Sequence, residues 1–133
     1  KRNKFLMAVF RQAAKPIISS ARSELAKYKK YSKTGQLRRS IKAFSTKASR
    51  RLPALYVGPK ATGGSAKKDK DRGGGYYGAM LEYGNANSPA HPFMRPAWDK
   101  SESTSSSILL AGTKKIVEKV LERELKGLKR IYK

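Results

Sequence analysis

The sequence predicts an α+β domain: a long N-terminal helix, a small antiparallel β-sheet with a long basic Gly/Lys loop, and a C-terminal amphipathic helix. Apolar residues recur at helical spacing near both ends of the chain, and two short segments between them alternate apolar and polar residues. A Gly- and Lys-rich stretch interrupts the pattern after the second of these segments. The 133 residues suit a single domain that spans 1–133.

The first helix is predicted over residues 4–31, where an apolar stripe repeats at steps of three and four residues. Its members are Leu6, Phe10, Ala13, Ile17, Ala21, Leu25 and Tyr28. Pro16 lies inside the stripe and removes one backbone donor, which predicts a kink or a restart. The segment 32–35 is expected to end this helix, and Thr34 to cap a short turn over 37–41.

Residues 41–49 and 52–58 are predicted to be the two strands, because apolar and polar residues alternate in them. Pro53 limits the start of the second strand to an entry or edge position, and the Gly-Pro pair at 58–59 is expected to stop it. Residues 60–75 hold five glycines and mixed charge, so they are expected to form a flexible loop.

The last part of the chain is predicted to hold a short and a long helix. Residues 76–83 fit both a short helix and a strand, and the helix is preferred. Residues 84–92 are expected to form an irregular connection. Pro96 suits the first position of a helix that runs to about residue 130. The Ser-rich stretch 101–107 is expected to be a weak or frayed turn, so the helix could also begin near Ser107.

Composition excludes several kinds of active site. The chain has no Cys and one His, which excludes disulfides, thiolate metal sites, a Cys nucleophile and a multi-His zinc site. Its nine acidic residues are scattered, whereas a divalent-metal nuclease needs clustered carboxylates. We therefore expect no enzymatic activity, no cofactor and no metal. The apolar run near the start is too short for a signal peptide or a membrane span.

The chain is strongly basic, with 31 Lys and Arg against nine acidic residues and a net charge of +22. Residues 76–100 are neutral and rich in aromatic residues and Pro, which indicates the structural centre, with basic segments facing solvent or a polyanion. A row of cations suits phosphate contact without base reading. The alternative is a solvated basic surface. The candidate DNA- or partner-facing residues are Arg38, Arg39, Lys47, Arg50, Arg51, Lys67, Lys68 and Lys70.

Several single features allow two interpretations. Glu82 among aromatic residues could be a catalytic acid, but its more ordinary role is to pair with an Arg or to cap backbone N–H groups. His91 is expected to be a packed turn residue. Phe93 and Trp98 could form a peptide-binding surface, although we prefer them as core anchors. The basic terminal helix could lie on a membrane, but packing on the domain or on a neighbour is preferred.

Three motifs in order resemble a known family. They are TGQLRRSI at 34–41, YYGAMLEYG at 76–84 and PFMRPA at 92–97. This order resembles the tail-completion (head–tail neck) proteins of long-tailed bacteriophages and prophages, in which T-G-x-L-R-x-S-I, Y-x-x-x-x-E-[FY]-G and P-F-x-R-P-A recur. Asn85 stands where family members usually carry Thr.

The resemblance implies a non-enzymatic virion protein at the head–tail junction or tail end, made in the host bacterial cytoplasm. It implies a homo-oligomeric ring, often sixfold, around the DNA channel. The implied partners are other neck, tail or head-connector proteins and packaged DNA, with no membrane. Two rivals remain: a free nonspecific nucleic-acid-binding protein, and a tail terminator or head-closure protein.

The resemblance also implies structural roles for motif residues. Leu37 and Ile41 are expected in the core, and Arg95 is expected to pair with Glu82. The turn and anchor positions that it implies are Thr34, Gly35, Tyr83, Gly84, Pro92, Phe93 and Pro96.

Overall fold

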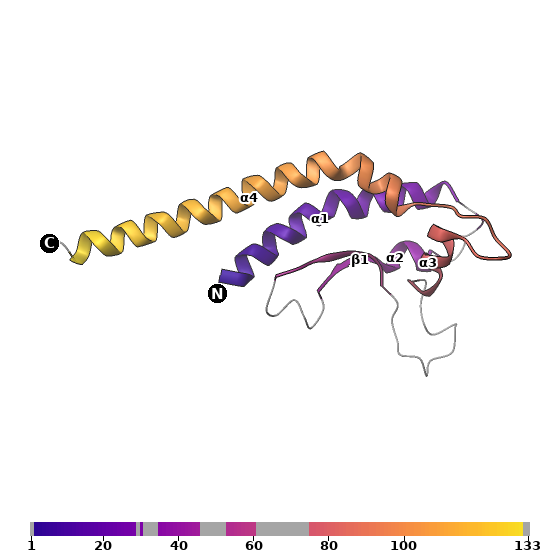
Figure 1. Cartoon of the computed structure of the whole chain (residues 1–133), viewed down its shortest axis with the longest axis horizontal. Helices are drawn as coiled ribbons and strands as arrows, with labels where there is room; N and C mark the ends of the chain where they lie inside the picture. Colours follow the sequence, from indigo (N-terminus) through magenta and orange to yellow (C-terminus); the bar gives the residue numbers. More distant parts are fainter. Residues whose placement is uncertain (1, 29, 31–34, 46–52, 61–74, 132–133) are drawn as a thin grey trace, which may run out of the picture.

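The computed structural model describes residues 2–28, 30, 35–45, 53–60 and 75–131. Its elements run α1 (Arg2–Ala26), α2 (Gln36–Ser40), β1 (Ile41–Phe44), β2 (Tyr56–Pro59), α3 (Gly75–Tyr83) and α4 (Met94–Ile131). The two long helices run antiparallel side by side, with the sheet and the two short helices on the other side of α1 (Figure 1). This arrangement confirms the predicted α+β class with helices at both ends.

Helix α1 is shorter than predicted at its C-terminal end. It stops at Ala26, because Lys27 and Tyr28 donate their N–H groups to carbonyls three residues back, which tightens the last turn. The Tyr28 hydroxyl then donates to the Pro92 carbonyl at 3.4 Å. Of the two outcomes expected at Pro16, the restart is wrong, since the helix continues through that residue, and the kink stays a prediction.

The chain enters the sheet through α2. Gly35 precedes this helix with a φ of 65°, a left-handed conformation that glycine adopts at no steric cost. The expected cap Thr34 lies outside the described residues. Leu37 and Ile41 are 5% and 0% exposed, which confirms both as core residues.

The two strands are antiparallel and shorter than predicted. Ile41 pairs with Pro59 and Phe44 with Tyr56, and the ring centroids of the latter pair lie 6.0 Å apart. β2 ends at the Gly-Pro pair as expected, with Pro59 as its last residue, and Lys60 donates the next N–H to the Ser40 carbonyl at 2.9 Å. The predicted extensions fall partly on residues 46–52, which lie outside the described residues.

Helix α3 confirms the preferred helical interpretation of 76–83, and an irregular connection follows it as expected. Gly84 ends the helix with a φ of 76°, and an added Cβ would lie 2.8 Å from the Ala90 nitrogen. Asn85 then forms a bridge with Ser88, and its side chain accepts from the Asn87 N–H at 3.0 Å. Asn85 therefore makes the turn at the position where the resembled family carries Thr.

Helix α4 begins at Met94, so Pro96 is its third residue and not its first. The Ser-rich stretch is not frayed, because it is the face that packs on α1: Ser101 and Ser105 are 2% and 5% exposed. The Ser101 hydroxyl donates to the Ala97 carbonyl at 2.6 Å, which satisfies its polar group inside the interface. Small side chains let the two helix backbones approach, and at Gly112 an added Cβ would overlap the Val9 side chain.

One hydrophobic cluster joins both long helices to the short elements. Its members are Ala21, Leu25, Leu37, Ile41, Leu81, Phe93 and Ala97. Phe93, Leu25 and Ile41 are the largest fully buried side chains. Phe93 is therefore a core anchor as preferred, whereas Trp98 is 47% exposed and is not.

Glu24 links the two long helices electrostatically. Its side chain is 7% exposed and accepts from Lys27 at 2.6 Å and from Lys100 of α4. Lys100 and, next, Lys27 hold the pKa of Glu24 below its ordinary value of 4.5, and Glu24 in turn raises the pKa of Lys27.

The second half of α4 extends beyond the N-terminal end of α1 (Figure 1). From Val117 to Ile131 every residue is exposed. Of the two expected placements of this segment, packing on the rest of the domain is therefore wrong for residues 117–131, and packing on a neighbour stays a prediction. In the described part of the chain, no helix has the length and apolar character required to cross a membrane.

Candidate functional site: a capped helix, an apolar groove and a basic ridge

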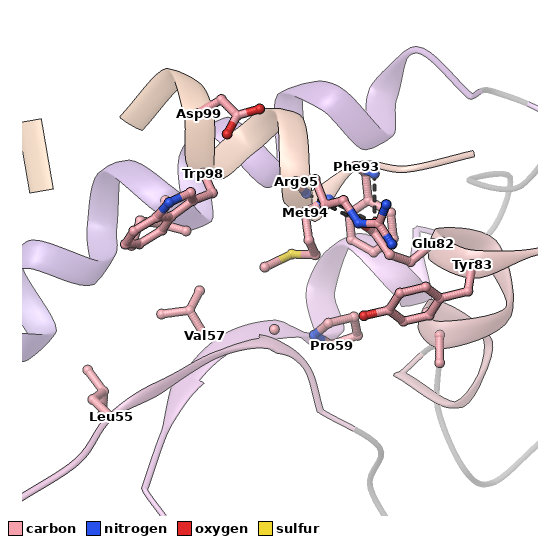
Figure 2. Close-up of a pocket in the computed structure, with 14 residues that line it drawn as sticks. Leu55, Val57, Pro59, Glu82, Tyr83, Phe93, Met94, Arg95, Trp98 and Asp99 are labelled. Atoms are coloured by element: carbon pink, nitrogen blue, oxygen red, sulfur yellow. Dashed lines mark hydrogen bonds and ion pairs between the residues drawn. The ribbon is translucent and has the colours of Figure 1, made fainter. Parts of the chain in front are cut away.

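The start of α4 is held by one carboxylate. The side chain of Glu82 accepts hydrogen bonds from the N–H groups of Phe93 at 2.8 Å, Met94 at 2.9 Å and Arg95 at 3.2 Å (Figure 2). The fourth N–H that a helix start leaves unpaired is missing here, because Pro96 has none. Glu82 thus accepts from all three N–H groups that have no partner inside the helix. Its negative charge also lies at the positive end of the helix dipole.

Arg95 pairs with Glu82, as the motif positions led us to expect, with 3.8 Å between Nε and Oε1. The two side chains are not buried together, since that of Arg95 is 67% exposed and that of Glu82 is 7% exposed. The Arg95 guanidinium lies 5.2 Å from the centroid of the Tyr83 ring. Because an exposed ion pair contributes only about 0–1 kcal/mol, the backbone amides are the principal partners of Glu82.

His91 lies in the turn before this cap. Its N–H donates to the Leu81 carbonyl at 2.7 Å, and its ring lies 5.1 Å from that of Tyr28. It is thus the packed turn residue that we expected. Among the described residues, no group of three or more His, Cys, Asp or Glu side chains gathers in a way that could hold a metal ion.

An open groove of about 810 Å³ lies between β2, α3 and the first turns of α4 (Figure 2). Its apolar and aromatic lining comes from Ile17, Leu55, Val57, Tyr83, Met94 and Trp98. Trp98 from α4 and Val57 from β2 face each other across it (Figure 2). Its charged lining residues are Glu82, Asp99 and Arg95, so this groove has a negative balance in a chain of net charge +22.

A basic ridge runs along α1 on a face separate from the groove. We define it as Lys4, Arg11, Lys15 and Arg22, which fall within an arc of about 40° and span about 27 Å of the helix. The one acidic residue of α1, Glu24, lies on the buried side. In the part of the chain that the structure describes, no salt bridge involves Lys4, Arg11 or Lys15.

The ridge meets one of the predicted basic residues at its C-terminal end. Lys15, Arg22 and Arg38 line a pocket of about 660 Å³ together with the hydroxyl residues Ser19 and Ser23. Arg22 also donates to the Ile41 carbonyl at 3.1 Å, so this side chain is fixed in place. Cations and hydroxyl groups in this arrangement suit an anion such as a backbone phosphate.

Two of the predicted DNA-facing residues lie in the described part of the chain. Arg38 and Arg39 are exposed on α2. The others lie outside the described residues: Lys47, Arg50, Arg51, Lys67, Lys68 and Lys70. The ridge was not predicted, although its spacing of seven, four and seven residues is a signal that a helical projection of α1 reveals.

The three motifs meet in space. Leu37 and Ile41 of the first, Leu81 of the second and Phe93 of the third share one buried cluster, and Glu82 of the second caps the helix that the third begins. Gly35 and Gly84 adopt the left-handed conformations expected at turns. Comparison of the chain with protein-family models, curated proteins and solved structures finds no match.

Proposed function

We propose that this chain is a non-enzymatic structural protein of the head–tail neck or tail end of a long-tailed bacteriophage, which assembles into a ring around the DNA channel. The observation that supports it most is the meeting of the three family-like motifs in one packed unit. Residues of all three motifs share one core, and Glu82 of the second caps the helix that the third begins, as parts of one structural unit do.

The distribution of charge also supports assembly around a polyanion. A chain of net charge +22 repels itself unless an anionic partner offsets the repulsion. The basic ridge with Arg38 provides a row of cations along one side of α1. In the ring that we propose, this row faces the DNA channel or an acidic neighbouring ring.

Mass and shape measurements test the proposal. Light scattering after size exclusion at two salt concentrations gives the mass, and negative-stain images give the shape. We expect a ring-sized species with a central hole. A chain that stays monomeric at both salt concentrations, alone and with phage tail ends, would contradict the proposal.

The ridge favours a second candidate, a free nonspecific nucleic-acid-binding protein. Such a protein binds DNA as a monomer or dimer, with an affinity that falls steeply with salt. Replacing Lys4, Arg11 and Lys15 with Gln should reduce the slope of log affinity against log salt by about 0.9 for each DNA phosphate that the variant no longer neutralises. The matched control replaces Lys119, Lys126 and Lys129 of α4, which carry the same charge. Equal effects of both triple variants would contradict a specific role of the ridge.

A further inference from the structure

From Leu110 to its C-terminal end, α4 presents an apolar stripe that nothing in the described part of the chain covers. Its members are Leu110, Val117, Val120, Leu121, Leu125, Leu128 and Ile131. On a helix of 3.6 residues per turn they fall within an arc of about 140°. This arc lies roughly opposite the face of Ala97, Ser101 and Ser105 that packs on α1, so a longer α1 would not cover the stripe.

The apolar groove beside Trp98 is the other open apolar surface. Trp98 and Tyr83 line it and are 47% and 69% exposed. Exposed aromatic residues around a concave apolar surface are typical of a binding site for an apolar segment.

The stripe cannot reach the groove of its own chain. Trp98 and Leu121 lie on one continuous helix, and 23 residues at 1.5 Å per residue separate them by about 35 Å. The helix would have to break and fold back for an internal contact. Any stripe that occupies this groove therefore belongs to another copy.

We propose that the apolar stripe of α4 docks in the apolar groove of a second copy of this chain. Charge favours this pairing over contact between two stripes. Residues 114–131 hold seven basic and three acidic residues, whereas the charged groove residues are two acids and one base. Two such helices side by side would bring like charges together, but the groove offers Asp99 to the cationic flanks of the stripe.

The geometry of this contact has a consequence for assembly. Each copy binds one neighbour through its α4 stripe and the other neighbour through its groove. Because the two surfaces differ, the interface is heterologous. Such an interface repeats from copy to copy until it closes into a ring or extends as a filament. The inference rests on the proposed self-assembly and names the surfaces that carry it.

Cross-linking of the full-length chain tests the contact, since the chain has no native Cys. One sample carries Ala79→Cys in the groove, and the other carries Val117→Cys, Leu121→Cys or Leu128→Cys in the stripe. The control carries Lys126→Cys, on the polar face of the same helix. After mixing and mild oxidation, we expect groove-to-stripe disulfides at one or more stripe positions and at least a fivefold lower yield with the control.

Two results would overturn the inference. Disulfides only between two stripes would show that α4 pairs with α4, and rings that persist in that case would leave the proposed function standing. No disulfide above the control, together with a monomeric mass at every concentration, would remove both the contact and the proposed assembly.

A charge-matched pair of variants gives a second measurement. Leu121→Glu with Leu128→Glu puts two carboxylates on the stripe, and Lys119→Gln with Lys126→Gln removes two positive charges from the polar face, so each variant lowers the net charge by two. We expect the first variant to become monomeric in light scattering while its far-UV circular dichroism stays helical, and the second to keep its assembled mass. An assembled mass that the stripe variant retains would overturn the inference.

Discussion

Replacing Glu82 with Ala removes one acceptor from three backbone amides at the start of α4. Phe93 is 0% exposed, so its N–H stays buried without a partner, at a cost of about 1–3 kcal/mol. The Met94 and Arg95 amides are only partly buried and can turn to water, so the cost of freeing them resembles that of removing an N-cap, about 0.5–2 kcal/mol. We therefore expect the free energy of unfolding to fall by about 2–5 kcal/mol.

This decrease is a large fraction of the stability of an ordinary domain, about 5–15 kcal/mol. Urea unfolding followed by far-UV circular dichroism measures it, with the slope compared to check that both chains unfold in the same way. Glu82→Gln keeps one carbonyl acceptor and loses the charge at the helix end, so it should cost only about 1–2 kcal/mol. The control is Glu102→Ala, an exposed change in α4, the helix that Glu82 caps. A Glu82→Ala chain within about 0.5 kcal/mol of the unmodified one would refute the capping argument.

Three further predictions concern the glycines and Glu24. Gly84→Ala should lower the free energy of unfolding in urea by about 2–4 kcal/mol, because the new side chain meets both a positive φ and nearby backbone atoms. Gly35 has a positive φ but open space around it, so Gly35→Ala should cost only about 1 kcal/mol. Equal costs at the two positions would contradict this account. In thermal melts, Gly112→Ala should destabilise the protein by about 1–3 kcal/mol, because the new methyl group overlaps the Val9 side chain. Gly127→Ala should stabilise it by up to about 1 kcal/mol, because the position is open and Ala favours a helix. A change of the same sign at both positions would contradict this prediction. The pKa of Glu24 in the folded state is lower than its ordinary value of 4.5. Its ion pairs therefore stabilise the protein at pH values above 4.5, and this stabilisation disappears as the pH falls through the folded-state pKa. Glu24→Gln should therefore flatten the fall of Tm below that pH, and an unchanged acid slope would oppose this.

The apolar patterns were sufficient to predict the helices and the sheet, because tertiary packing uses the faces that these patterns define. The ends of the elements were predicted less well. Tyr28 leaves α1 early because its ring and hydroxyl contact the 91–92 segment, more than sixty residues away. A contact so distant in sequence leaves no local signal.

The Ser-rich stretch shows where composition misleads. A polar run in a helix is ordinarily read as a solvated or frayed segment. Here Ser101 and Ser105 are small enough for close helix packing, and the Ser101 hydroxyl binds a carbonyl of its own helix. The prediction failed because it considered polarity and not side-chain volume.

The cap by Glu82 was among the roles predicted for it, but its three partners required the fold. The groove was not predicted, since its lining comes from four separate parts of the chain between Ile17 and Asp99. The basic ridge could have been predicted, because its spacing lies within a single helix.

The central claim is that copies of this chain close into a ring around DNA. Electron cryomicroscopy of the purified chain, with and without short duplex DNA, tests it most directly. The account predicts closed rings of one dominant copy number, with the basic ridge of α1 lining a central channel wide enough for a duplex. Isolated monomers or dimers along DNA, with no closed species at low or high salt, would contradict the claim and favour a free nucleic-acid-binding protein.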